Sequence, residues 1–164
     1  MNIPEFEEQS ISFGFGGIDL LANDDINEAQ VGYSSLEDGE DLCGTEDGDW
    51  KTEWLVIGND SLQGDPIFID SVVEGFPVYA VPHGEGEWNP ELISQSYSGF
   101  INIILELKKL AVGREHPVGL GNNPMTRDEY EKFVGYCRQE GSITETLFWE
   151  VLVSDEEAGI EPGI

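Results

Sequence analysis

The fold of this chain is decided by residues 54–112, which read WLVIGNDSLQGDPIFIDSVVEGFPVYAVPHGEGEWNPELISQSYSGFINIILELKKLAV. Three short runs in this stretch, 54–57, 66–70 and 77–82, are rich in β-branched and aromatic residues. Gly, Asn and Asp separate them, and these residues favour turns. The pattern predicts three strands, and the prolines that bound the last one suit a strand end or a sheet edge.

A helix is predicted directly after the third strand. Asn89 is a favourable N-cap, Pro90 fits the first helical position, and Glu91 complements the positive end of the helix dipole. Gly113 marks the end. Between them, apolar residues recur at alternating steps of four and three and so share one face: Ile93, Tyr97, Phe100, Ile104, Leu107 and Ala111.

The amino-terminal part predicts less regular structure. In residues 10–16 apolar residues alternate with small ones, which predicts a strand with one apolar face. Its Gly-Phe-Gly-Gly segment predicts a bend or a close backbone approach, because no Gly-Lys-Ser/Thr follows to make a phosphate loop. We expect residues 18–21 to lead into a short helical turn, in which Asn23 or Asp24 caps residues 25–31.

The carboxyl-terminal part predicts two more helices. Residues 113–124 are rich in Gly and Asn and predict a loop. Thr126 with Glu129 forms a capping-box pattern that opens a helix, and Ser142 with Glu145 repeats the pattern for another.

Charge is the most informative property of the composition. The 164 residues contain 34 Asp and Glu against 7 Lys and Arg, a net charge of −27. Residues 1–107 hold 23 of the acids and a single base, Lys51. Such a field repels nucleic acid and anionic membranes and attracts basic surfaces, although acidity also serves solubility alone. We therefore expect a basic protein partner and no nucleic acid.

We expect a cytoplasmic protein without a membrane span. The most apolar stretch, 100–112, is interrupted by polar and charged residues. The first eight residues carry three glutamates and no base, unlike a positively charged leader. Cys43 and Cys137 lack metal-like spacing and are expected to be reduced thiols.

No catalytic motif is present, so we expect no enzyme, no cofactor and no metal. His83, Glu85 and Glu87 would share one face of a strand as a metal or acid-base set, but the interspersed glycines predict a turn instead. The acidic stretch 33–51 does not place its acids at the positions a calcium loop requires, so a solvated loop is expected.

The middle of the chain resembles the SUKH superfamily, which includes Smi/Knr-like regulators and bacterial toxin-immunity proteins. The resemblance covers about residues 13–110 and is carried by Gly-Gly-Ile-Asp-Leu-Leu at 16–21, Trp-Leu-Val-Ile-Gly-Asn-Asp at 54–60, Gly-Asp-Pro-Ile-Phe-Ile-Asp at 64–70, Pro-Val-Tyr at 77–79, His-Gly-Glu at 83–85 with Trp88, and the helical segment 93–105 with Phe100.

The resemblance implies an α+β fold with a mainly antiparallel sheet packed against helices, and a non-enzymatic interaction role. The family usually begins with a longer helix, which the first ten residues here do not match, and residues 124–153 lie outside the resemblance. We therefore expect a single domain over 1–164, with a family-like core at about 13–110, a helical extension at about 124–153 and an acidic tail at 155–164.

We expect an immunity protein that binds and neutralises a cognate toxin of the nuclease or deaminase type, since such a toxin needs a basic cleft for phosphates that an acidic partner can fill. The alternatives are a regulatory or scaffold module that binds another basic protein, and a small-ligand or metal binder, or an enzyme, around His83. The tryptophans at the expected contact surface are candidate anchors, or else core residues. The candidate partner-binding residues are Glu37, Asp38, Glu40, Asp41, Glu46, Asp47, Asp49, Trp50, Glu85, Glu87 and Trp88.

Overall fold

The computed structural model describes residues 3–154, so the acidic tail expected at 155–164 lies outside the described residues. Six strands form one antiparallel sheet whose order, β1-β2-β3-β4-β5-β6, is the order of the chain. This confirms the predicted α+β class with a mainly antiparallel sheet. The strands are β1 (Gln9–Phe13), β2 (Gly16–Leu20), β3 (Trp54–Asp60), β4 (Pro66–Asp70), β5 (Val78–Ala80) and β6 (Glu91–Ser94). The helical elements are a 3-10 turn (Asn23–Asp25), α1 (Ile26–Ala29), α2 (Tyr97–Ala111), α3 (Pro117–Asn122), α4 (Arg127–Glu140) and α5 (Leu147–Val153).

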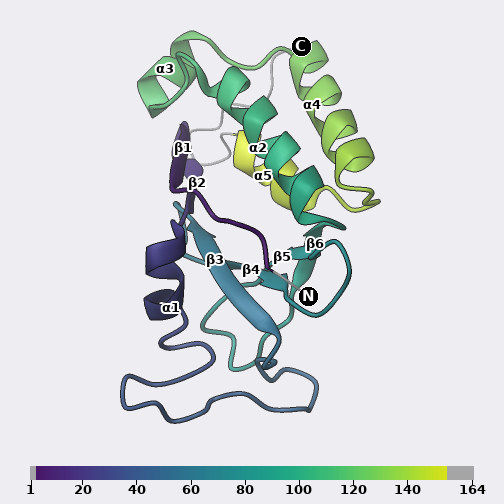
Figure 1. Ribbon diagram of the computed structural model, residues 1–164. Coiled ribbons are helices and arrows are strands. Elements are labelled where there is room, and N and C mark those ends of the chain that lie inside the picture. Colours follow the sequence, from purple (N-terminus) through teal and green to yellow (C-terminus); the bar gives the residue numbers. More distant parts are fainter. Residues whose placement is uncertain (1–2, 155–164) are drawn as a thin grey trace.

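The sheet is covered on both faces. Helices α2, α4 and α5 lie over one face, and the long loop that follows α1 extends at the other end of the molecule (Figure 1). In β4, Ile67 and Ile69 pack in the helix-side cluster while Phe68, between them, packs in a second cluster. Successive side chains of a strand point to opposite faces, which explains why this strand is one continuous apolar run.

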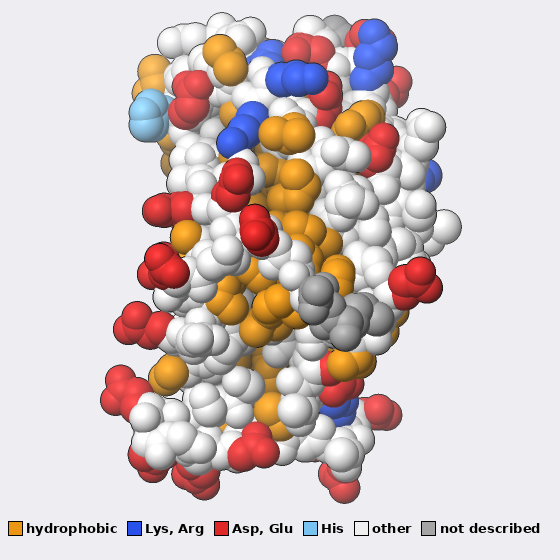
Figure 2. Space-filling view, in the orientation of Figure 1, with side chains coloured by type: hydrophobic (Ala, Val, Ile, Leu, Met, Phe, Trp, Pro, Cys, Tyr) orange, Lys and Arg blue, Asp and Glu red, His pale blue; other side chains and the backbone are white. Residues whose placement is uncertain are grey.

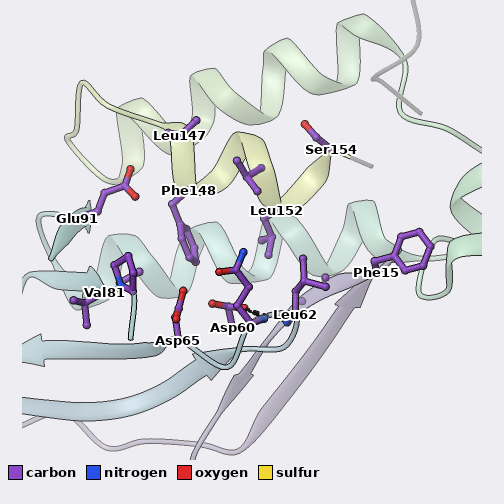
Figure 3. A pocket seen from close by; sticks show the side chains of 16 residues that line it. Phe15, Asp60, Leu62, Asp65, Val81, Glu91, Leu147, Phe148, Leu152 and Ser154 are labelled. Atoms are coloured by element: carbon purple, nitrogen blue, oxygen red, sulfur yellow. Dashed lines mark hydrogen bonds between the residues drawn. The ribbon is translucent and has the colours of Figure 1, made fainter. Parts of the chain in front are cut away.

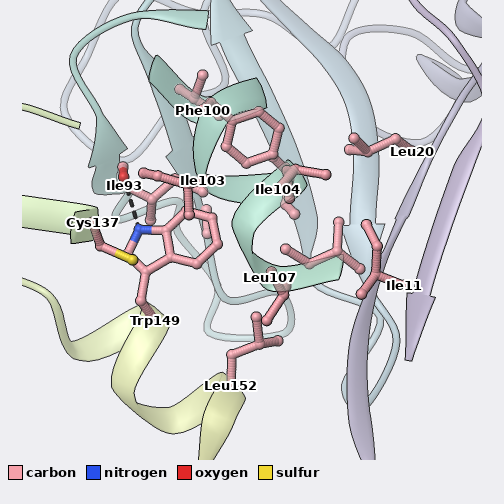
Figure 4. Close-up of a cluster of buried hydrophobic side chains, with 14 of the residues drawn as sticks. Ile11, Leu20, Ile93, Phe100, Ile103, Ile104, Leu107, Cys137, Trp149 and Leu152 are labelled. Carbon is pink, nitrogen blue, oxygen red and sulfur yellow. Dashed lines mark hydrogen bonds between the residues drawn. The ribbon is translucent and has the colours of Figure 1, made fainter. Parts of the chain in front are cut away.

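The helix-side core is closed by the last helix. Trp149 of α5 is fully buried, and its indole Nε1 donates a hydrogen bond of 2.9 Å to the carbonyl oxygen of Ile93 in β6. Figure 4 shows this bond together with Phe100 and Leu107 of α2. The segment outside the family resemblance is therefore part of the same core as the sheet.

The predicted amino-terminal strand is a hairpin of two strands. Gly14, with a φ of 59°, turns β1 back into β2, so residues 18–20 form a strand, which leads into the 3-10 turn at Asn23–Asp25. At Gly17 an added Cβ would lie 2.2 Å from the carbonyl oxygen of Ile11, which confirms the predicted close backbone approach. The helix expected over 25–31 is confined to the single turn of α1.

The long helix begins later than predicted. Residues 91–94 pair with β5 as an edge strand, and the helix starts at Tyr97, where the Ser96 hydroxyl accepts a 3.0 Å hydrogen bond from the Gly99 amide. The cap pattern at Asn89 was therefore misleading, because strand pairing satisfies the backbone of this segment instead.

Of the two predicted capping boxes, only the first forms. Thr126 and Glu129 exchange both hydrogen bonds at the start of α4, as predicted. Ser142 instead has a φ of 50°, and α5 starts only at Leu147.

The loop predicted over 113–124 contains α3, whose first residue is Pro117. Proline suits this position because no amide donor is needed there. The structure also buries Arg114, which is 6 % exposed. Its guanidinium donates to the carbonyl oxygens of Leu110, Asn123 and Pro124 and to the carboxylate of Glu129, so one cation joins α2, α3 and α4.

Within residues 3–154, no helix combines the length and the apolar character that crossing a membrane requires.

Candidate functional site

An aromatic cluster lies on the sheet face opposite the helices. We define this aromatic cluster as Tyr33, Trp50, Trp54, Phe68, Tyr79 and Trp88. Phe68 and Tyr79 are directly opposite each other on β4 and β5 and stack with their ring centroids 5.2 Å apart. Trp54 of β3 stacks on the same Phe68 at 4.5 Å. Three strands thus provide an aromatic floor, onto which Trp50, Tyr33 and Trp88 pack from the loops.

Trp50 is the centre of this cluster. Its ring centroid lies 5.2 Å from those of Tyr33, Trp54 and Trp88 and 5.1 Å from that of Phe68. Only 2 % of Trp50 is exposed, so it cannot serve as a surface anchor in the folded protein. Of the two candidate anchors, Trp88 is half-buried and retains surface that a partner can touch.

Backbone hydrogen bonds fasten the acidic loop to this cluster. The amide of Gly44 donates to the carbonyl oxygen of Trp50, and the amide of Leu42 donates to that of Ser34, both at 2.9 Å. Further back, the Gln30 side chain donates to the Val56 carbonyl oxygen and accepts from the Val56 amide, each at 2.9 Å. The loop is therefore held at both its beginning and its end, although residues 36–50 have no regular secondary structure beyond an isolated bridge at Asp41.

The predicted contact acids of this loop lie on its outer surface. Six of the seven, Glu37, Asp38, Glu40, Asp41, Glu46 and Asp47, are exposed, and Asp49 is half-buried. Asp38, Asp41 and Asp49 each accept a hydrogen bond from a backbone amide of the loop itself, at 2.9 to 3.0 Å. Within residues 3–154 none of the seven forms an ion pair. The nearby Lys51 donates to the backbone carbonyl oxygen of Glu46 rather than to a carboxylate.

A second loop joins the acidic loop where Trp88 lies. The Trp88 amide donates a 2.9 Å hydrogen bond to the Gly48 carbonyl oxygen. A Cβ added to Gly48 would lie 2.9 Å from the Cβ of Glu87, so the two loops touch directly. Glu85, nearby in the chain, is exposed. The structure thus places Glu87 next to the acidic loop, as expected, and we define the acidic face as residues 36–49 with 85–88.

Two leucines on the acidic face were not singled out from the sequence. Leu36 and Leu42 are each 40 % exposed, although both sit among carboxylates. The turn between them brings the amide of Leu36 to the carbonyl oxygen of Glu40 at 2.9 Å. Unlike Trp50, these leucines therefore have apolar surface that is open to solvent.

Charged side chains are unevenly distributed over the molecule. The acidic loop lies at the lower end of the molecule in Figure 1, and Figure 2 shows acidic side chains around this end. Most basic side chains in that view lie at the opposite end, where the helices are.

His83 contacts Asp65 and does not form a ligand set with Glu85 and Glu87. Its Nδ1 lies 2.5 Å from the Asp65 Oδ1, which also accepts a hydrogen bond from the His83 amide at 3.1 Å. About half of the His83 side chain, 52 %, is exposed. No group of three His, Cys, Asp or Glu in the described part of the chain could hold a metal ion. The structure therefore separates His83 from Glu85 and Glu87 as a ligand set.

A hollow of about 320 Å³ opens beside Asp65, between α5 and one end of the sheet. Figure 3 shows Phe148 and Leu152 extending from α5 toward Asp65 and Asp60, with Phe15 at one end. The lining residues are Phe15, Gly16, Gly17, Asp60, Leu62, Gln63, Asp65, Ala80, Val81, Pro82, Glu91, Leu147, Phe148, Val151, Leu152 and Ser154. The sequence offered no signal for this hollow, because its lining comes from strand ends and a distant helix.

Comparison of the chain with family models, with curated proteins and with solved structures found no match.

Proposed function

We propose that this chain is a non-enzymatic protein-binding module that docks on a basic surface of a partner protein through its acidic face. The observation that carries the proposal is a set of seven loop carboxylates without an ion pair in residues 3–154, displayed on a loop that Trp50 fixes to the sheet. An ordered loop loses less conformational entropy on binding than a mobile one. Unpaired carboxylates also attract a basic partner and speed its association.

The partner that best suits this face is a toxin domain that acts on nucleic acid. Such a domain needs a basic cleft for phosphates, and acidic side chains spaced along a loop can occupy the same cleft. The resemblance of residues 13–110 to the SUKH superfamily supports an immunity role for the module. In this proposal it works in the cytoplasm, where the free thiols of Cys43 and Cys137 suit a reducing compartment.

Within the acidic face, the charged and the apolar side chains have different roles in binding. The carboxylates steer the partner, while Leu36, Leu42 and Trp88 supply apolar surface that becomes buried on docking. A regulatory or scaffold module that binds another basic protein would use the same face.

The test is a matched pair of charge-reversal variants. In the first, Glu37, Glu40 and Glu46 become Lys, because within residues 3–154 none of these three carboxylates holds a turn through a hydrogen bond, in contrast to those of Asp38, Asp41 and Asp49. The control reverses the exposed Glu5, Glu7 and Glu8, which lie near the amino terminus and outside the acidic face, and changes the net charge equally.

Binding to the protein encoded by the adjacent gene is measured by calorimetry at about 50 and about 200 mM salt, a range over which screening of exposed charges increases. We expect the loop reversal to weaken binding at least tenfold and to flatten its salt dependence, while the control binds within about threefold of wild type. Equal losses in both variants, or no binding by the wild-type protein, would overturn the proposal.

A further inference from the structure

The hollow beside α5 combines apolar walls with carboxylates and has no Lys or Arg in its lining. Phe15, Leu62, Leu147 and Val151 line it and are between 43 % and 59 % exposed, so much of its apolar surface is open to solvent. Its volume of about 320 Å³ is at the lower end of the range for small-molecule sites, about 300 to 1,000 Å³. The hollow is therefore large enough for a small organic molecule or a single long side chain.

Three carboxylates, Asp60, Asp65 and Glu91, line the same hollow, and none of its lining residues is Lys or Arg. Asp60 accepts hydrogen bonds from the amides of Leu62 and Gln63, at 3.1 and 2.7 Å, which orients its carboxylate at the hairpin. Asp65 is held only by the half-exposed His83 in the described residues. The hollow thus presents fixed acceptors and no permanent positive charge.

Glu91 is the half-buried carboxylate of the hollow. Burial raises the pKa of its carboxyl group, and the neighbouring Glu145 raises it further, while a hydrogen bond from the Phe148 backbone offsets part of the rise. A cation placed in the hollow would favour the charged form of Glu91, so its binding would be coupled to the ionisation of this group.

The chain's own carboxyl-terminal segment is a poor occupant. The described chain ends at Ser154, on the edge of the hollow, and the ten residues that follow read DEEAGIEPGI, with four acids and no base. Like charges on the segment and on the hollow repel each other.

We propose that this hollow binds an organic cation with an apolar body, an ammonium or guanidinium group on an aryl or alkyl stem. The stem packs between Leu152 and the Phe148 ring, which extend into the hollow from α5 (Figure 3), and the charged end reaches Asp60 and Asp65. This proposal does not depend on the acidic face. Cationic side chains of a protein and free amines both carry a cationic group on an apolar stem, so the experiment includes both.

The test titrates the full-length protein with three probes of one shape, 4-phenylbutylamine, 4-phenylbutan-1-ol and 4-phenylbutyrate, followed by two-dimensional amide NMR. We expect the amine to shift the amides of Gly17, Leu62 and Val151 in a saturable way, the alcohol to bind at least tenfold more weakly, and the carboxylate not to bind. Similar shifts from the three probes, or shifts elsewhere in the molecule only, would overturn the proposal.

Two variants and a control make the assignment specific. Asp60→Asn removes one acceptor charge and should weaken amine binding about tenfold, as expected for loss of a charge-assisted contact. Val151→Lys places a competing ammonium at an exposed position of α5 and should abolish binding without disturbing the core, because Val151 is 43 % exposed. Glu131→Gln on α4, which is not among the lining residues, should bind as wild type does. Unchanged binding by both hollow variants would contradict the proposed site.

A capped peptide with one arginine between two leucines distinguishes the sources of the cation. Tighter binding of the peptide than of the amine assigns the hollow to a side chain of a partner protein. Binding of the amine with no binding of the peptide assigns it to a free small molecule. Failure of these probes leaves the charge-reversal result on the acidic face unaffected, so the two proposals stand or fall separately.

Discussion

The rings of Trp50 and Trp88 meet edge to face, with 5.2 Å between their centroids and 78° between their planes. Trp50 comes from the acidic loop and Trp88 from the loop between β5 and β6, so this contact joins two segments that are far apart in the chain. Phe68 of β4 lies beneath Trp50 at 5.1 Å. The position of the acidic face relative to the sheet therefore depends on one buried indole.

Replacing Trp50 should release the acidic loop. Trp50→Ala removes four aromatic contacts at a buried site, and we expect it to lower the free energy of unfolding by about 3 to 5 kcal/mol. Trp50→Phe keeps an aromatic ring and removes an indole Nε1 that has no acceptor within residues 3–154, so its cost should be clearly smaller. Denaturant unfolding measures both variants, and faster cleavage by a Glu-specific protease reports loop release. Equal costs for Ala and Phe would contradict the role given to ring packing.

Glu91 should destabilise the fold at neutral pH. Because burial and Glu145 raise its pKa in the folded state, the folded protein binds its proton more tightly than the unfolded chain does. Its contribution to stability is therefore present below the unfolded pKa and is lost as pH rises through the raised folded pKa. We expect Glu91→Gln to have a higher Tm than wild type at pH 7 and the same Tm near pH 3. An equal difference at both pH values would exclude titration of Glu91 as the cause.

Arg114 should matter far more than the exposed cations. Arg114→Met leaves the carbonyl oxygens of Leu110 and Asn123 without their donor and removes the partner of Glu129. We expect a loss of about 3 kcal/mol or more in the free energy of unfolding, since each unsatisfied buried group costs about 1 to 3 kcal/mol. Lys132→Met, at an exposed pair with Asp128, is the control and should cost about 0.5 kcal/mol or less. Similar losses in both variants would show that Arg114 is not a structural cation.

Two helical glycines should respond in opposite directions to the same change. In α4 a Cβ at Gly135 would meet no atom within 4 Å, so Gly135→Ala should stabilise the protein by about 0.5 to 1 kcal/mol through helix propensity. In α2 a Cβ at Gly99 would lie 2.4 Å from the carbonyl oxygen of Glu140, so Gly99→Ala should destabilise despite the same gain. Thermal unfolding separates the two cases, and a stabilised Gly99→Ala protein would refute the close packing of α2 against the end of α4.

The parts of the fold that could be predicted from sequence are those whose signals are local. The strands at 54–57 and 66–70 and the capping box of Thr126 with Glu129 need only neighbouring residues, and all three are present. The predicted start of α2 was wrong. Asn89 and Pro90 match the local pattern of a helix cap, but residues 91–94 pair with β5 instead, and a local pattern does not contain that pairing.

The candidate site divides in the same way. Exposure of the loop acids follows from composition, and Trp88 and Glu87 do lie against the acidic loop. The sequence left open whether Trp50 is a surface anchor or a core residue, because the aromatic partners that bury it, on β3, on β4 and in two other loop segments, are not neighbours in the chain. The hollow beside α5 was not predictable either, since it exists only once α5 packs across the strand ends.

The chain-order pairing of the sheet also has a consequence for how the protein folds. Each strand pairs with the next one along the chain, so most of the sheet consists of hairpins with contacts that are short in sequence, which favours rapid folding; the pairing of β2 with β3, across residues 21–53, is longer. The contact of Trp149 is longer still, because its partner Ile93 is 56 residues away. A nascent chain that has not yet produced α5 would leave the apolar helix side of its sheet incompletely covered. Chaperone binding to ribosome-held chains should therefore persist until Trp149 emerges, and then cease.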